Sequence, residues 1–587
     1  MKKVKLFSFA LAALMLGACS SEDVIDNGGN GTVLPGEQGY ISLGINLPTT
    51  PSSRAANDQF DDGTEDEYAV DDATLIVLEG TSESTATVTG VYTLTLPGAT
   101  NVGTITDNIT TSYQLTQKIK KPSANNNLYA LVVLNNDSVA FDEFSGKKLS
   151  VLNTAFDKDF LNENKHILMT NAPLYTKPGG TTNPTSDNSG NVVTLTEINP
   201  ENVFTTEAEA QANPAANVYV ERALAKVTVR QGNNYTSGSE GKFVSAEIQG
   251  WTLDVTNKYS YLVRNMTDAD WWSYNAARPT GSSSETGAAD DYRFVGSVPV
   301  SAGLYRTYWG VDPNYSTDKT ASDFVYLSGT APVPDNMTKL STSSEDHAMY
   351  CKENTFDVTN QNQNQTTRII VAAKLTVTGA DASTGTFFTL DNNKDVIYTE
   401  NTIKDVIRSY IVANKQVKDV LTNKISGEVD TDKIGVNFDE ESTNGDLKIS
   451  VDFGELFEGA DVPVELQAGN AVYDNALAEV NSHVYSRYVN GIAYYPVMIK
   501  HFGDDLTPWS ADGKTSSYPD PDAAAKWLGR YGVLRNNWYD ISVTSIKSIG
   551  SADVPDVYGV SDDPVESWIS VKINVLSWAK RTQEVGL

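Results

Sequence analysis

Apolar residues alternate with polar residues in many short segments of this chain, and this period of two is the feature that most restricts its fold. Successive side chains of a β-strand point to opposite faces, so the pattern predicts half-buried strands. Val, Ile, Thr and Tyr enrichment, with Gly, Asn and Asp between the runs, favours an all-β sandwich over a parallel α/β sheet. The predicted strands are Tyr40–Leu47, Ala73–Leu78, Leu128–Leu134, Val218–Arg230, Ile369–Val377, Leu447–Phe453, Ile541–Ile546 and Ile569–Leu576.

Helices are expected to be few and peripheral. One is predicted to begin at Thr402, whose hydroxyl can cap it while Asp405 occupies the third helical position. A second is predicted from Asp520 to Gly529, because Pro521 suits a first helical turn and glycine a helix end.

The chain is long enough for more than one domain. Its 587 residues correspond to two to four domains at about 150 residues each. The stretches Lys177–Ala216 and Thr280–Asp291 are rich in residues that favour turns and are predicted loops. A boundary between two sandwich domains is placed near residue 225, just beyond the first of these loops.

The N-terminus has the pattern of a bacterial lipoprotein signal. Lys2, Lys3 and Lys5 precede a short apolar run that ends in Leu16-Gly17-Ala18-Cys19. The run is too short for a transmembrane helix, and the small residues before Cys19 admit a processing peptidase. Cys19 is therefore the predicted lipidation site, the alternative being an ordinary cysteine near a frayed end. Residues 20–39 are a predicted tether.

Charge and cysteine content exclude some partners and one kind of fold. The formal net charge is −31, and residues 1–54 contribute four basic and four acidic residues, so the chain without them keeps −31. Nucleic acid and anionic membranes would repel such a surface, although solubility explains the charge equally well. Once Cys19 is lipidated, Cys351 has no partner, which excludes an internal disulfide framework.

Two predicted strands at opposite ends of the chain share nearly the same pattern. Each places an aliphatic residue at every odd position, so each offers four aliphatic side chains to a core and a polar face to water. Burying four such side chains contributes roughly 6 to 12 kcal/mol before entropy. The two segments could therefore occupy the same groove between neighbouring strands. Alternatively, they are two ordinary half-buried strands that resemble each other by chance. The aliphatic residues are Ile41, Leu43, Ile45 and Leu47, and Ile569, Val571, Ile573 and Val575.

The loop after the first of these strands has the composition of a protease substrate. Prolines keep residues 48–56 extended and outside any ladder, and Arg54 offers a cationic specificity residue. Cleavage between Arg54 and Ala55 would leave a hydrophobic slot that another extended segment fills by strand addition. The C-terminal strand, flanked by Trp568 and Trp578, is the predicted donor. Alternatively, Arg54 is an ordinary surface residue and the tryptophans belong to a core.

The sequence predicts no catalytic residue, cofactor or metal site. His166, His347, His483 and His501 are far apart, and no paired-histidine zinc pattern occurs. The Gly-x-Ser-x-Gly pattern of a nucleophilic serine is missing, and Gly513-Lys514-Thr515 fails as a phosphate loop because position 508 is proline. The acidic cluster Asp58–Glu67 lacks EF-hand spacing and is predicted to be a solvated turn.

A surface glycan-binding lipoprotein that acts as a monomer is the alternative function. Trp271, Trp272 and Tyr274 could form an aromatic platform for a sugar, or could be core residues. Glycan binding predicts a stable monomer, whereas strand exchange predicts polymers that depend on proteolysis.

Several short motifs carry a family resemblance through their order along the chain. They are Val218–Val227, Gly250–Leu253 with Asn257 and Lys258, Glu353–Thr355, Tyr488–Gly491 with Tyr494 and Tyr495, Arg535–Tyr539 and Val575–Trp578. Together with the lipoprotein signal, they resemble the fimbrillin family of type V pili, in the version that forms the major shaft subunit of short fimbriae. The chain is long for this family and has loops such as Thr280–Asp291 that do not align, which leaves open a shaft or a tip role.

The resemblance implies two transthyretin-like β-sandwich domains in tandem and assembly by donor-strand exchange. It implies a signal peptide at 1–19, a tether and removable strand at 20–54, an N-terminal domain at 55–225, and a C-terminal domain at 226–587 that contains the donor strand, 568–587. The implied partners are other copies of the subunit, anchor and tip fimbrial subunits, an arginine-specific surface protease and, during export, the outer membrane. The implied role is structural and adhesive, at a cell-surface fimbria, without enzyme activity or cofactor.

Overall fold

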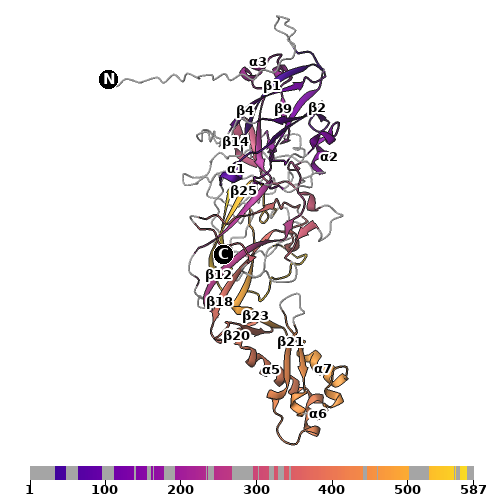
Figure 1. Cartoon of the computed structure of the whole chain (residues 1–587), viewed down its shortest axis with the longest axis vertical. Coiled ribbons are helices and arrows are strands. Elements are labelled where there is room, and N and C mark those ends of the chain that lie inside the picture. The colour runs from indigo at the N-terminus through magenta and orange to yellow at the C-terminus, as the bar shows by residue number, and fades with distance from the viewer. Residues whose placement is uncertain are drawn as a thin grey trace, which may run out of the picture.

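The chain forms an elongated molecule in which an N-terminal β domain, a central β-sandwich and a partly helical unit follow one another along the long axis (Figure 1). The structure is a computed structural model. It describes residues 33–47, 64–95, 112–123, 125–137, 140–154, 160–162, 164–176, 192–232, 235, 243–266, 295–301, 303–315, 323–327, 336–342, 345–357, 359–439, 446–458, 461–501, 528–560, 562 and 569–577.

The N-terminal domain is built on an eight-stranded sheet. Its strand order is β3-β2-β5-β6-β10-β1-β4, and β9 pairs with β5. The strands are β1 (Gln38–Asn46), β2 (Ala73–Gly80), β3 (Thr87–Leu94), β4 (Ser112–Lys120), β5 (Asn127–Leu134), β6 (Met169–Asn171), β9 (Thr196–Ile198) and β10 (Ala216–Arg222).

The central strands of this sheet are buried on both faces. In β2, Leu75 and Val77 pack in one hydrophobic cluster, whereas Ile76 and Leu78 pack in another on the opposite face. The first cluster includes the aliphatic residues of β1. The second includes Leu262 and Val263, so a segment that follows the first strands of the sandwich returns to cover the N-terminal sheet.

The central sandwich consists of two facing sheets that share one core. One sheet has the order β17-β11-β25-β26 and the other β12-β18-β24. Val227 of β11 and Ile541 of β25 pack in the same cluster as Val371 of β18 and Tyr495 of β24. The strands are β11 (Leu224–Gln231), β12 (Phe243–Asp254), β17 (Met349–Lys352), β18 (Arg368–Val377), β24 (Ile492–Met498), β25 (Asn537–Ile546) and β26 (Ile569–Ser577).

The predicted strand Val218–Arg230 is in fact two strands, one in each domain. The chain leaves the N-terminal sheet at the end of β10 and enters the sandwich sheet at the start of β11, with Ala223 between them. Periodicity alone did not reveal this break, because both strands are apolar on alternate positions and Ala223 is itself buried.

A partly helical unit is inserted between two neighbouring strands of the sandwich. Strands β18 and β24 pair directly, yet residues 378–491 separate them in sequence. The helices pack with β19, β21 and β22 around a core of their own. The elements of this unit are β19 (Phe387–Leu390), β20 (Asn393–Tyr398), α5 (Glu400–Ala413), α6 (Lys415–Lys424), β21 (Gly435–Asp439), β22 (Lys448–Asp452), α7 (Ala471–Val480) and β23 (Tyr485–Tyr488).

The prediction that a helix begins at Thr402 was wrong by one turn. The N-cap of α5 is Thr399, whose side-chain oxygen accepts a hydrogen bond from the Thr402 amide at 3.3 Å. The Thr402 hydroxyl in turn accepts one from the Thr399 amide at 2.8 Å. Two threonines three residues apart thus form the reciprocal cap, and the sequence pattern did not distinguish which of them is outside the helix.

Short elements connect the sheets, and several lie within the predicted loop Lys177–Ala216. That expectation was wrong for its described part, where β8, β9 and α3 form. The remaining helices and strands are α1 (Glu65–Tyr68), α2 (Leu149–Thr154), α3 (Glu207–Ala212), β7 (Leu174–Tyr175), β8 (Val192–Val193), β13 (Thr256–Asn257), β14 (Val295–Ser301), β15 (Leu304–Thr307) and β16 (Phe324–Val325). The 3-10 turns are 141–144, 200–202, 313–315, 363–365, 431–433, 455–457, 464–466 and 489–491.

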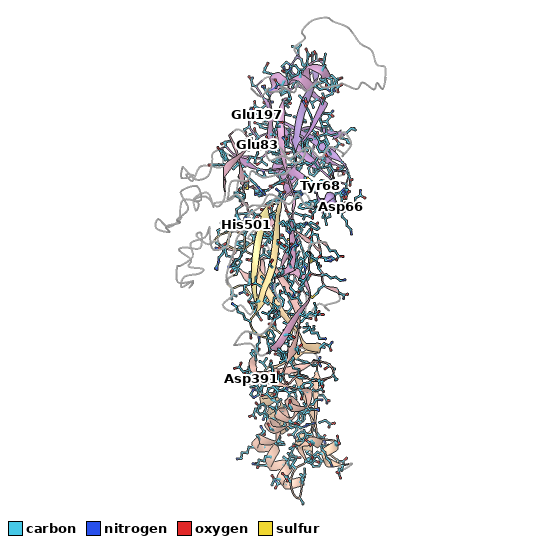
Figure 2. All side chains as sticks on the ribbon, turned by 90° about the vertical axis from the view of Figure 1, so that its left-hand side faces the viewer. Asp66, Tyr68, Glu83, Glu197, Asp391 and His501 are labelled. Atoms are coloured by element: carbon cyan, nitrogen blue, oxygen red, sulfur yellow. The ribbon has the colours of Figure 1, made fainter. Side chains whose placement is uncertain are left out.

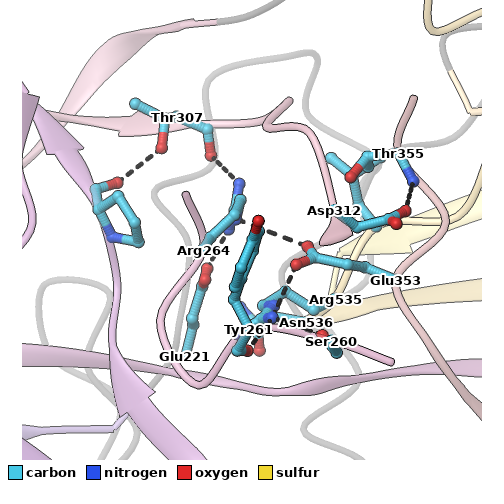
Figure 3. A network of polar contacts seen from close by, with 12 residues as sticks. Glu221, Ser260, Tyr261, Arg264, Thr307, Asp312, Glu353, Thr355, Arg535 and Asn536 are labelled. Atoms are coloured by element: carbon cyan, nitrogen blue, oxygen red, sulfur yellow. Dashed lines mark hydrogen bonds and ion pairs between the residues drawn. The ribbon is translucent and has the colours of Figure 1, made fainter. Parts of the chain in front are cut away.

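A buried polar network joins the N-terminal sheet to the sandwich (Figure 3). Arg264 donates a hydrogen bond to Glu221 of β10, and Arg535 donates one to Glu353 at 2.6 Å. The Arg264 Nε and Glu353 Oε2 atoms lie 3.9 Å apart, so the two pairs are linked. All four side chains are buried, and removal of any partner would leave an uncompensated charge inside the protein. The network therefore opposes separation of the two domains.

Candidate functional site

The first strand occupies an internal position in the N-terminal sheet. β1 pairs in parallel with β10 from Leu43, opposite Ala216, to Asn46, opposite Tyr219. On its other side it pairs with β4 in antiparallel fashion along its whole length. A strand close to the start of the chain is thus held between two strands that lie far from it in sequence, near the upper end of the molecule in Figure 1.

The aliphatic side chains of this strand belong to the core, as the alternation predicted. Ile41, Leu43, Ile45 and the following Leu47 are all buried. They pack in one cluster with residues of β2, β5 and β10. Tyr113 of β4, opposite Ile45, is buried in the same cluster, and burial raises the pKa of its phenol. This face of the groove is apolar and keeps its tyrosine neutral.

The opposite face of β1 was expected to be exposed to water, and this expectation was wrong. Ser42 is 0% exposed and Asn46 is 4% exposed. The Ser42 hydroxyl accepts a hydrogen bond from Gln114 Nε2 at 3.3 Å, and Asn46 Nδ2 donates one to the Val218 carbonyl at 3.4 Å. Helix α3 packs over this face, and the Ala215 amide beyond it donates to the Ser42 carbonyl at 2.7 Å.

Removal of β1 would open the sheet rather than shorten its edge. Among the strand pairs of the described residues, β4 pairs with β1 alone. Without β1, both β4 and β10 present unpaired N–H and C=O groups toward one slot, and the four aliphatic sites of the core lose their occupants. Such a slot accepts an extended segment by strand addition, which restores both ladders at once.

The residues just after the predicted cleavage loop are fastened to the body of the protein. Glu67 of α1 is buried, and its carboxylate lies 2.7 Å from the Lys226 ammonium. Its carbonyl accepts a hydrogen bond from Arg222 Nε at 2.9 Å, and the Tyr350 hydroxyl donates to its carboxylate. The expectation that the whole cluster Asp58–Glu67 is solvated was therefore wrong at Glu67.

This anchor lies at the junction between the N-terminal domain and the sandwich. Figure 2 shows Asp66 and Tyr68 of α1 between Glu83 of the N-terminal domain and His501 of the sandwich, with Asp391 of the inserted unit farther along. The strand on one side of the loop can therefore leave while the chain on the other side stays attached. Sequence reasoning missed Glu67, because an isolated glutamate in an acidic run gives no signal of burial.

The predicted donor strand lies in the sandwich of its own chain. β26 is the edge strand of its sheet and pairs in antiparallel fashion with β25, with Ile573 opposite Ile541. Ile569, Val571 and Val575 lie in the same strand. Among the paired strands described, β25 is the only one that hydrogen-bonds to β26. Its departure would therefore break one ladder and leave β25 at the edge of the sheet.

Several predicted features fall outside the described residues. They are the lipoprotein signal with Cys19, the cleavage site Arg54–Ala55, the aromatic residues Trp271, Trp272 and Tyr274, residues 520–527 of the predicted helix Asp520–Gly529, and the tryptophans Trp568 and Trp578. The last two residues of that predicted helix, Leu528 and Gly529, form a turn.

The described part of the chain has neither a metal-binding cluster nor a membrane-spanning helix. No group of three or more His, Cys, Asp or Glu side chains there is arranged to hold a metal ion. None of the described helices is both long enough and apolar enough to cross a membrane. The buried thiol of Cys351 has its pKa raised to about 12 by desolvation, which disfavours its reactive thiolate.

Residues 486–584 match the family model described as "Major fimbrial subunit protein type IV, Fimbrillin, C-terminal". The matched residues contain β24, β25 and β26. No curated protein matches the chain.

Solved structures with weak overall similarity come from Parabacteroides and Bacteroides species. A proposed cell adhesion protein from Parabacteroides distasonis is 11% identical over 92% of this chain and 99% of its own, with a TM-score of 0.36. A proposed cell adhesion protein from Bacteroides eggerthii is 10% identical over 94% and 100%, with a TM-score of 0.32. A fimbrial assembly protein from Parabacteroides distasonis is 10% identical over 57% and 95%, with a TM-score of 0.25. Similarity at this level carries no conclusion about this chain.

Proposed function

We propose that this chain is a fimbrillin-family protein and a structural subunit of a cell-surface fimbria, because its residues 486–584 match the C-terminal fimbrillin model. In this proposal, proteolysis after Arg54 frees β1, and β26 of another copy takes its place. The fimbria supports adhesion, and the repeating contact is between identical subunits. Anchor and tip subunits and an arginine-specific surface protease complete the set of proposed partners.

One observation carries the proposal, namely the position of β1 between β10 and β4. The strand is internal, contributes aliphatic side chains to the core, and is followed by the proline-containing loop with Arg54. If this loop is cleaved, as we propose, the strand can leave and its slot can accept a donor strand. The buried anchor at Glu67 supports the same interpretation, since it holds the cleaved chain in the domain.

Exchange is favourable because the donor strand gains a second neighbour. In its own chain β26 pairs with β25 alone, whereas a strand in the place of β1 pairs with β4 and β10 together. Each added hydrogen bond contributes about 0.5 to 1.5 kcal/mol net. In the proposed exchange, Ile569, Val571, Ile573 and Val575 fill the four aliphatic sites that β1 leaves. Cleaved subunits are therefore expected to form a high-mass ladder that withstands detergent and is lost on heating, and a persistent monomer after cleavage would contradict the proposal.

Substitution of Leu43 by alanine should destabilise the precursor and leave the fimbria unchanged. The substitution removes buried methyl groups from the core at a cost of about 2 to 5 kcal/mol, but the assembled subunit no longer contains β1. Urea unfolding of both forms measures the effect. Val218→Ala in β10 is the matched control, because Val218 packs in the same cluster and stays in the mature domain. Equal destabilisation of the fimbria by Leu43→Ala would contradict removal of β1.

Export as a lipoprotein is proposed from the pattern Leu16 to Cys19. Substitution of Cys19 by alanine is expected to abolish labelling by a clickable palmitate analogue and to prevent outer-membrane delivery. Cys351→Ala is the control, since Cys351 is buried and should not carry a lipid. A Cys19→Ala protein that still takes up the label and reaches the surface would exclude lipidation at this residue.

A further inference from the structure

The donor strand reproduces the polar residues of β1 as well as its aliphatic ones. When residues 569–575 are laid over residues 41–47, Ser570 falls on Ser42 and Asn574 falls on Asn46. The aliphatic positions receive isoleucine or valine. Only the central position changes its chemistry, because Lys572 stands where β1 has Gly44.

The surroundings of the even-numbered positions of β1 favour this alignment. A shift by one residue would place the aliphatic side chains on the polar face and the polar ones in the core. A shift by two residues in either direction would place Lys572 at the site of Ser42 or of Asn46, which are 0% and 4% exposed. Either shift would bury a lysine, which is costly without a paired charge. The unshifted alignment brings Lys572 to position 44, which is also buried but lies between Asn217 and Gln114, whose side chains are exposed.

The surroundings of Gly44 can receive a longer side chain. A Cβ atom at Gly44 would lie 2.3 Å from Oδ1 of Asn217, so the Asn217 amide closes over the glycine. Asn217 is opposite Gly44 in β10 and its side chain is exposed, so it can turn aside toward solvent. The absence of a side chain at Gly44 therefore leaves room for Asn217 while β1 is in place. When the donor strand brings Lys572 to this position, the Asn217 side chain must move.

The acceptors around this position suit a cation. Gln114 is opposite Gly44 in β4, and its Nε2 donates to the carbonyl of Gln211 in the last turn of α3 at 3.3 Å. A helix C-terminus carries partial negative charge and favours a nearby ammonium group. Helix α3 also contains Glu207 and Glu209 and no basic residue. Both glutamates lie in the first turn of α3, so the niche at its other end is formed by amide and carbonyl oxygens, which can accept from a cation.

We infer that Lys572 fixes the register of the donated strand by entering the niche formed by Asn217, Gln114 and the C-terminal end of α3 in a second copy of this chain. The inference rests on the exchange of β1 for β26 proposed above. Through this contact between Lys572 of one copy and Asn217 of another, a subunit recognises the donor strand of its own kind. In this arrangement, the four aliphatic side chains hold the donor strand in the slot, and the lysine selects one register.

Substitutions that change the charge at both positions test the inference. Lys572→Glu places an anion beside the C-terminal end of α3, and Asn217→Lys places a second cation beside Lys572, so each should slow ladder formation by cleaved subunits roughly fivefold. The double variant, Lys572→Glu with Asn217→Lys, should recover most of the rate. Lys418→Glu is the control, because it reverses the charge of an exposed lysine on α6, in the distant inserted unit. Unchanged urea unfolding of each precursor excludes a folding defect.

The outcomes separate the register from the exchange itself. If the factor by which the double variant slows ladder formation equals the product of the two single factors, Lys572 does not contact Asn217 and the inferred register is wrong. If a chain that lacks residues 568–587 still polymerises after cleavage, the exchange is wrong as well. Loss of polymers on that deletion, combined with recovery in the double variant, is the result that the inference predicts.

Discussion

Substitution of Arg54 by alanine is expected to abolish polymer formation and to leave a folded precursor on the cell surface. Without cleavage, β1 stays covalently linked to its domain and remains paired with both β4 and β10. A strand from another molecule cannot compete with a tethered strand, because the tether gives β1 a very high effective concentration. The measurement is the ladder of unheated whole-cell extract on a detergent gel, which should collapse to a single monomer band.

Assembly is expected to require cleavage of the loop and not Arg54 itself. Replacement of residues 51–54 by the recognition sequence of an unrelated protease should therefore block assembly until that protease is added. N-terminal sequencing of the natural fimbriae should give Ala55 as the first residue. Normal polymers from Arg54→Ala, or fimbrial subunits that begin upstream of residue 55, would exclude this maturation.

Substitution of Ile573 by aspartate should also abolish assembly, although cleavage proceeds normally. In the proposed register Ile573 takes the place of Ile45, opposite the buried Tyr113 and in a cluster of aliphatic side chains. An unpaired carboxylate there costs several kcal/mol, which offsets much of what the four aliphatic side chains contribute. Ladder formation after cleavage measures the effect.

The matched control is Ile573→Val, which removes one methyl group and costs only about 0.5 to 1.5 kcal/mol. It should assemble almost normally. Because β26 also pairs with β25 in the free subunit, the urea unfolding of both precursors must be compared, and both must remain folded. Polymers of normal length from a folded Ile573→Asp protein would mean that this residue does not enter the core of a neighbour.

The alternation in the sequence located several strands of both domains, but it missed others, among them β3, β4, β12 and β24. It identified Ile41, Leu43 and Ile45 as core residues, because a half-buried strand leaves a clear period of two. It did not reveal that the other face of β1 is covered, since Ser42 and Asn46 are polar and their burial depends on α3, which is distant in sequence.

Features that depend on long-range contacts could not be predicted. Glu353 and Arg535 were noticed as parts of family motifs, yet their pairing and their link to Glu221 through Arg264 become visible only when the domains are placed together. The inserted unit was missed for a different reason. Its helices have their own core and interrupt two strands, β18 and β24, that pair as direct neighbours.

Cysteine cross-linking tests the exchange of β1 for β26 most directly. In a Cys351→Ser background, Ile573→Cys is combined with Tyr113→Cys of β4 or with Ile541→Cys of β25, and a short bifunctional thiol reagent is added before and after cleavage. In the free chain residue 573 is opposite residue 541, so the 573–541 pair should cross-link within one molecule before cleavage. After cleavage, the 573–113 pair should join separate molecules into ladders, because residue 113 is opposite Ile45. Polymers in which 573 links only to 541 of the same chain, and never to 113 of another, would contradict the account.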